Sequence, residues 1–226
     1  MKKIYCIIIP AFLFLEMLSG NCIAQAPQQT VMVSKKAGVG FRAGLNFAKV
    51  SSNGDSVAYH YKSGLMIAVF LTPPHTGTVG YRSELLYSNQ GFKYTEPDGN
   101  TGNITNDYLM LPQMMTVNIT KYVQLQAGAF AGYLLRSKNS NAPPDNSQEN
   151  KTYLDLMNRI AYGAAGGIEI HPFKGMILNA RYNMGFSKLY KENRQANATP
   201  VFPDFLPFGN IDTKNAVIQF SVGYQL

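Results

Sequence analysis

Eight segments of this chain alternate apolar and polar residues with a period of two, and this pattern limits the fold more than any other feature. In an extended strand successive side chains point to opposite faces, so a period of two indicates a β-strand. The closing stretch NAVIQFSVGYQL shows it best, because every second residue from Ala216 to Leu226 is apolar. We predict strands at residues 38–49, 59–72, 77–92, 107–119, 122–136, 159–171, 175–188 and 214–226. No segment shows a convincing helical period.

The connections between these strands alternate in length. Those after the second, fourth and sixth strands are short, at residues 73–76, 120–121 and 172–174, whereas the others are longer and polar. Each strand is long enough to cross the hydrocarbon core of a bilayer, which takes roughly 9–11 tilted residues. Short turns in the periplasm and long loops outside are typical of bacterial outer-membrane barrels. We therefore expect an all-β fold, an eight-stranded antiparallel up-and-down transmembrane β-barrel that crosses the outer membrane many times.

The N-terminus has the order of a secretory signal. Lys2 and Lys3 precede an apolar run at 4–18, and small or neutral residues follow up to Ala24. We predict a signal peptide at 1–24, a periplasmic segment at 25–37 and the barrel at 38–226. A lipid anchor on Cys22 is the alternative, although Asn21 stands where such signals need a small residue. Cleavage after residue 24 removes both cysteines, which excludes disulfides and thiol chemistry in the mature chain.

Every charged residue well inside a predicted strand falls opposite the apolar set. A Lys or Arg that faces lipid at the midplane costs roughly 2–4 kcal/mol, so the apolar set should face lipid and the charges should face the interior. Buried charges without partners are costly, and an eight-stranded barrel has room only for its own side chains. We expect salt bridges that fill the lumen, with an anion-selective pore as the alternative. The interior charges are Arg42, Lys62, Arg82, Glu84, Glu169 and Arg181.

A water-soluble barrel would also alternate, but its polar face would lie in water and be rich in Lys, Glu and Thr. Here that face is rich in small residues, which indicates a crowded interior instead. Gln113 is an exception, since it falls on the set that should face lipid. The small residues are Gly40, Gly44, Gly64, Gly80, Gly128, Gly132, Ala161, Gly163, Ala165, Gly167, Gly185 and Gly223.

Six stretches of the mature chain resemble a known family. They are GFRAGLNFAKV, SELLYSNQGFKY, YLMLPQMMTVNIT, GAAGGIEI, LNARYNMGFS and NAVIQFSVGYQL. Together they resemble the PorT-like outer-membrane β-barrel proteins of Bacteroidota, a porin-family group. The resemblance implies an eight-stranded barrel and specifies no biochemical role. Met110 departs from relatives that often carry an acidic residue there, so one interior ion pair of those relatives would be missing.

The resemblance also implies that the barrel-insertion machinery reads the terminal strand. The residues of this insertion signal are Phe220, Val222, Tyr224 and Leu226. Chains of this kind usually end in an aromatic residue, commonly Phe, whereas this chain ends in Leu226. We therefore expect the signal to be present in a weakened form.

Residues for catalysis or cofactor binding are not apparent. His60, His75 and His171 are too scattered for a metal site, and no Ser/His pair has a persuasive setting. The net charge is +7, but an exported chain with no basic run longer than Lys35-Lys36 is not expected to bind nucleic acid. We predict a protein that is not an enzyme and has no catalytic, cofactor-binding or metal site.

Two loop segments could carry a partner or a modification. Five large apolar residues in the last loop, Val201, Phe202, Phe205, Leu206 and Phe208, form either a contact patch for a protein or a cover over the barrel mouth. Ser56 lies in an Asp-Ser-Val pattern that resembles O-glycosylation sites of the same phylum. Besides outer-membrane lipid and the insertion machinery, we therefore expect a protein partner at the loops. The leading function is structural or surface-interacting; the alternative is a transport or secretion accessory, either a narrow pore or a component of a type IX-like secretion machine.

Overall fold

The computed structural model describes residues 37–51, 58–95, 99, 101–139, 154, 157–189 and 214–226. These residues form nine strands. They are β1 (Gly38–Ser51), β2 (Ala58–His60), β3 (Lys62–Thr72), β4 (Val79–Thr95), β5 (Thr101–Asn118), β6 (Val123–Asn139), β7 (Ile160–Ile170), β8 (Met176–Gly185) and β9 (Lys214–Gln225). Among the described residues, no helix has the length and apolar character to cross a membrane. The predictions at 1–24, at Ser56 and at 201–208 lie outside the described residues.

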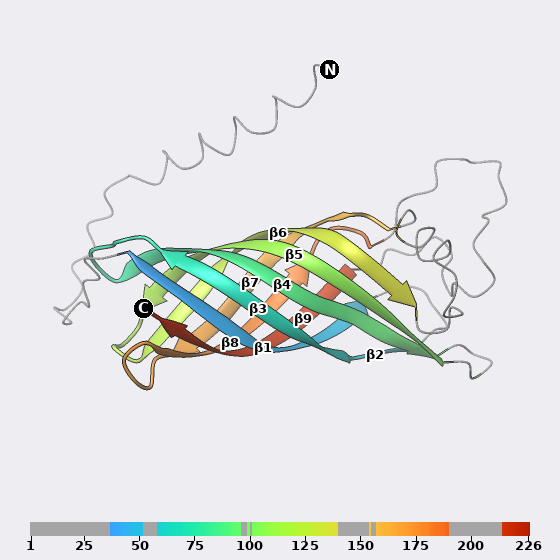
Figure 1. Ribbon diagram of the computed structural model, residues 1–226, viewed down its shortest axis with the longest axis horizontal. Helices are drawn as coiled ribbons and strands as arrows, with labels where there is room; N and C mark the ends of the chain where they lie inside the picture. The colour runs from blue at the N-terminus through green and yellow to red at the C-terminus, as the bar shows by residue number, and fades with distance from the viewer. Residues whose placement is uncertain are drawn as a thin grey trace, which may run out of the picture. The chain divides into compact units, whose positions relative to one another are not determined.

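Eight of the strands close into an antiparallel ring. The short β2 comes just before β3 in the chain and pairs, like β3, with β4. The order around the ring is β4-β3-β1-β9-β8-β7-β6-β5, and the β4–β5 pairing closes it. The predicted fold is thereby confirmed. The short turns after β3, β5 and β7 lie at the same end of the barrel as the C-terminus (Figure 1). We call this the turn end, and the opposite end the loop end.

The prediction of one continuous strand at 59–72 was wrong, because the structure has two separate strands there, β2 and β3. β3 pairs with β4 through Met66 opposite Ser88, whereas β2 pairs with β4 through His60 opposite Lys93, which is a register shifted by one residue. A shift of one residue turns side chains to the other face. His60 and Tyr61 are consequently both exposed.

The third to fifth strands extend further than predicted at the loop end. The β4–β5 ladder continues past Tyr94 opposite Gly102 to Thr95 opposite Thr101, and the β5–β6 ladder reaches Ile104 opposite Asn139. The third connection is therefore only residues 96–100. The alternation fades there because many of these residues are polar on both faces, while the backbone ladder continues.

Proline and glycine explain two local features of the wall. Pro112 lies inside β5, and the β4–β5 ladder skips Glu84 and Leu85 opposite it, since proline has no N–H to donate. Gly91 has a φ of +139°, and a Cβ there would lie 1.9 Å from the carbonyl oxygen of Ile104. Only glycine allows this close approach of β4 to β5.

The outer face of the barrel is an apolar belt. Leu65, Ile67 and Phe220 are 65%, 60% and 53% exposed. The inner face of the same strands holds side chains that are almost fully buried. This inverted pattern requires hydrocarbon around the barrel, because so much contiguous apolar surface is not tolerated in water.

Candidate functional site: the filled lumen and its two ends

A carboxylate in the middle of the lumen joins two walls of the barrel. Glu84 on β4 accepts hydrogen bonds from Arg42 Nη2 on β1 (2.6 Å to Oε2) and from Arg181 Nη1 on β8 (2.7 Å to Oε2). Arg181 Nη2 also donates to Glu84 Oε1 at 2.9 Å, so this pair is bidentate. The three side chains are fully buried. The carboxylate therefore offsets the charge of two arginines at once.

A second ion pair lies closer to the turn end. Arg82 Nη1 on β4 donates to Glu169 Oε2 on β7 at 2.6 Å, and its guanidinium lies 4.4 Å from the centre of the Phe70 ring. His171 Nε2 lies 3.1 Å from the other oxygen, Glu169 Oε1. The His171 contact was not predicted from the sequence, where the three histidines were considered only as metal ligands and were too scattered for a metal site. An acidic residue two positions before a histidine at the end of one predicted strand was the available signal, because side chains two positions apart lie on the same face.

Two amides connect these ion pairs into one network. Gln126 on β6 donates to Glu169 Oε2 at 2.8 Å and accepts from Arg181 Nη2 at 2.8 Å. Asn179 on β8 donates to Gln126 Oε1 at 3.1 Å and accepts from Arg42 Nη1 at 2.9 Å. We call these seven residues, Arg42, Arg82, Glu84, Gln126, Glu169, Asn179 and Arg181, the polar plug. They come from β1, β4, β6, β7 and β8, so the plug crosses the lumen from wall to wall.

Neither amide of the plug was predicted from the sequence, where only the charged residues on the inward face were expected to meet. Gln126 and Asn179 lie on that same face, at the level of the charges, and this position was a usable signal. Without them, the charged groups would be two separate clusters.

Lys62 is the one predicted interior charge that lies outside the plug. It is 8% exposed near the loop end, and its Nζ lies 3.4 Å from the carbonyl oxygen of Gln90. No carboxylate lies within ion-pair distance of it in the described part of the chain. The expectation that all six interior charges pair was therefore wrong for Lys62 among the described residues.

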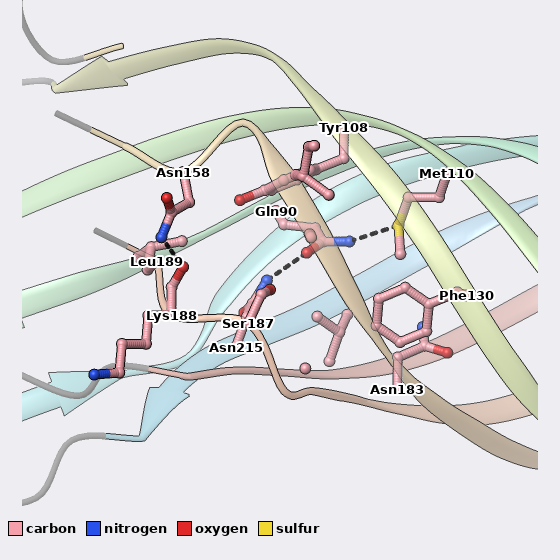
Figure 2. Close-up of a pocket in the computed structure, with 14 residues that line it drawn as sticks. Gln90, Tyr108, Met110, Phe130, Asn158, Asn183, Ser187, Lys188, Leu189 and Asn215 are labelled. Carbon is pink, nitrogen blue, oxygen red and sulfur yellow. Dashed lines mark hydrogen bonds between the residues drawn. The ribbon is translucent and has the colours of Figure 1, made fainter. Parts of the chain in front are cut away.

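Apart from Lys62, the loop end of the lumen is filled by uncharged side chains in the described part of the chain. Buried apolar residues, including Met66, Leu86, Met110 and Leu134, pack together there. Figure 2 shows Gln90 bridging this cluster to the opposite wall: it accepts from Asn215 Nδ2 at 2.5 Å and donates to Met110 Sδ at 3.3 Å. The cavity around Gln90 measures about 20 Å³. This volume holds about one water molecule, so no solute path passes through it.

The turn end opens into a wider mouth of about 640 Å³. His75, Lys121 and Lys174 line its rim, while Arg82 and His171 lie deeper. The mouth ends at the Arg82–Glu169 pair of the plug and does not continue as a channel through it. Among the described residues, no cluster of three or more His, Cys, Asp or Glu side chains could hold a metal ion.

The outer face holds the remaining described positions of interest. Phe220, Val222, Tyr224 and Leu226 are all exposed on the lipid side of β9 or just after it. Gln113, the amide that breaks the pattern, accepts a hydrogen bond from the Tyr81 hydroxyl and donates to Ser83 Oγ at 3.0 Å. Its polar atoms are satisfied within the wall, which lowers the cost of placing an amide next to lipid.

A closed antiparallel ring with an apolar exterior and a hydrogen-bonded polar interior defines an integral β-barrel of the outer membrane. The family model described as "Outer membrane protein beta-barrel domain" matches residues 23–191, which cover most of the chain. The protein belongs to this family and is located in the bacterial outer membrane, with its strands crossing the bilayer. No curated protein sequence matches it.

Several solved barrels resemble the chain in structure. Neisserial surface protein A has 11% sequence identity and a TM-score of 0.51, over 83% of this chain and 97% of that protein. Ail, the attachment invasion locus protein of Yersinia pestis, has 14% identity and a TM-score of 0.43, over 84% of this chain and 99% of its own. The outer membrane protein W of E. coli has 16% identity and a TM-score of 0.40, over 85% and 99% of the two chains. At these identities the likeness is one of fold.

Proposed function

We propose that this protein is a non-conducting, non-catalytic barrel whose role is structural or surface-interacting, through its extracellular loops. The polar plug carries this proposal. Its charged groups hold each other from opposite walls at 2.6–2.9 Å, and opening a solute path would break several charge-assisted hydrogen bonds at once. With the lumen filled, the parts of the molecule left to meet a partner are its two ends.

The loops supply a partner surface of defined charge. Residues 52–57, 96–100, 140–156 and 190–213 contain nine acidic and three basic residues. A docking partner should therefore present a neutral or basic surface, because an acidic one would be repelled. The apolar residues at 201–208 would supply the desolvated centre of such a contact.

Conductance in planar bilayers tests the filled lumen. We expect no conductance steps from the purified protein at high salt. The variant that combines Arg42→Ser, Glu84→Ser and Arg181→Ser with Leu86→Ser and Met110→Ser empties the lumen in both halves and should conduct, because the space that these side chains occupy becomes accessible to water. Lys62→Ser, outside the plug, is the matched control and should stay silent. Steady steps from the unaltered protein would overturn the proposal.

Capture from native membranes tests the surface role. Tagged protein should co-purify a partner from its own outer membrane, and a variant with Phe202, Phe205 and Phe208 all replaced by Ser should lose it. If this variant still captures the partner, the apolar residues at 201–208 do not form the contact with it. Folding is checked by the different gel mobility of heated and unheated barrel.

As a second candidate function, we propose that the protein is a PorT-like barrel of Bacteroidota with an accessory role in secretion. The stretches SELLYSNQGFKY and YLMLPQMMTVNIT support it by resemblance. In that case deletion of the gene blocks export of secreted cargo, and the captured partner is a component of the secretion machine. Normal export in the deletion strain would exclude this role.

A further inference from the structure

The charges on the outer face of the barrel are distributed unevenly. Among the exposed or half-exposed basic side chains near the loop end, four lie on one part of the outer wall: Lys49 on β1, Lys93 on β4, and Arg136 and Lys138 on β6. Lys188 and Lys214 lie beyond β1 toward β8 and β9. The one acidic side chain on the outer face of the described residues is Asp107, which lies opposite Arg136. We call the four basic residues the basic collar.

The first part of the collar spans three neighbouring segments. Lys49 Nζ lies 5.6 Å from the centre of the Tyr61 ring, directly after β2. His60 at the end of β2 pairs with Lys93 on β4. Side chains directly opposite each other in a sheet are about 5 Å apart, so Lys49, Tyr61, His60 and Lys93 form one continuous surface.

The second part continues this surface across β5. Lys93 pairs with Asn103, while Thr105, two residues further along β5, pairs with Lys138. Lys93 and Lys138 thus lie on either side of one strand, with their backbones about 12 Å apart. Arg136 follows two positions along β6, on the same face.

None of the four collar residues forms an ion pair within the part of the chain that the structure describes. Asp107 offsets at most one of these four charges, because it is a single carboxylate, and its Oδ1 also accepts a hydrogen bond from Asn89 Nδ2 at 2.5 Å. Four basic side chains on one face repel each other, so an arrangement of this kind is stabilised by an anion bound between them.

The depth of the collar indicates where this anion comes from. The wall at the collar and just below it is apolar and aromatic, with Tyr61, Tyr87 and Tyr133 all exposed. Aromatic girdles of this kind mark the interface between hydrocarbon and headgroups. The collar therefore lies at the level of the headgroups of the outer leaflet, on the lipid-facing side of the wall and outside the lumen.

We propose that the basic collar binds the phosphate groups of a phosphorylated glycolipid in the outer leaflet. Its cations lie on three strands, β1, β4 and β6, of a surface that spans five adjacent segments, which suits a headgroup that carries more than one phosphate. Juxtamembrane Lys and Arg residues each strengthen binding to anionic lipid by roughly fivefold. The collar would hold such a lipid against the barrel as a fixed annular ligand.

The test compares collar and control variants in vesicles of defined lipid. Folded protein is reconstituted in phosphatidylcholine that contains a minor fraction of bisphosphorylated lipid A, and lipid A retained per barrel after detergent extraction is measured by mass spectrometry. Lys49→Gln with Lys93→Gln should lower retention at least about tenfold. Lys121→Gln with Lys174→Gln removes two lysines from the turn end and should leave retention unchanged. Gel mobility checks that both variants fold.

Three results would overturn the proposal. The first is equal retention by the collar variant and the unaltered protein, which would follow if the acidic loops of the same chain neutralised the collar. The second is an equal loss in the turn-end control. The third is equal retention of phosphatidylglycerol and lipid A when each is offered alone, because a collar that recognises several phosphates must prefer the lipid that carries them.

Discussion

The two halves of the barrel interior are filled by different chemistry. The turn-end half is closed by ion pairs that cross the lumen, such as Glu84 with Arg42 and Arg181. The loop-end half is closed by apolar side chains, such as Leu86, Met110 and Leu134, with a few amides beside them. Both halves are equally well buried, so burial alone does not explain the difference.

Geometry and energetics distinguish these two ways of filling a lumen. Ion pairs need fixed partners from opposite walls, and they therefore define how the strands are arranged around the ring. Apolar packing tolerates small shifts but leaves no void that water or ions could use. A barrel built this way is held in register at one end and sealed at the other.

The largest effect that separates the halves is expected from Glu84→Gln. This change leaves Arg42 and Arg181 buried without their carboxylate, and breaking a buried pair in this way costs about 3–5 kcal/mol of the free energy of unfolding. Denaturant unfolding in vesicles, followed by far-UV circular dichroism because the chain has no Trp, measures it. Adding Arg42→Met and Arg181→Met to the same chain should recover most of the loss. A loss below about 1 kcal/mol would show that the plug is not structural.

A smaller but clear loss is expected from Leu134→Ala in the loop-end half. Leu134 is fully buried, and the cavity left by its side chain should cost about 3 kcal/mol. Its neighbour Leu135 is 46% exposed on the lipid side, so Leu135→Ala is the matched control. The control should lose less than half as much in the same unfolding assay. Equal losses would mean that the loop-end half is loosely packed, and the contrast between the halves would fail.

The smallest effect is expected from Lys62→Met. Lys62 is a buried charge in the apolar half, and its contact with Gln90 is a long one to a backbone carbonyl. Replacing it by a side chain of similar length should change the free energy of unfolding by less than about 1 kcal/mol. Arg42→Met, which takes one partner from Glu84, should cost several times more. Similar losses for the two variants would show that Lys62 belongs to the polar plug after all.

The sequence was sufficient for the architecture because one physical constraint repeats in every strand. Alternation separates lipid-facing from inward residues, and connection length separates the two ends of the barrel. Arg42 and Glu84 could therefore be placed on the inner face without any structure. Residue 62 begins β3 one register away from His60, and no local pattern marks that break, since both residues are polar.

The sequence by itself determined which side of the wall each residue occupies, because this depends only on the parity of its position in a strand. The tertiary structure decided which inward residues meet, since Glu84 reaches Arg181 97 positions away only when the ring has closed. It also brought Lys93 and Lys138 to one surface across β5. Partners of this kind are set by strand register, and register is the sum of every turn, bulge and pairing around the barrel.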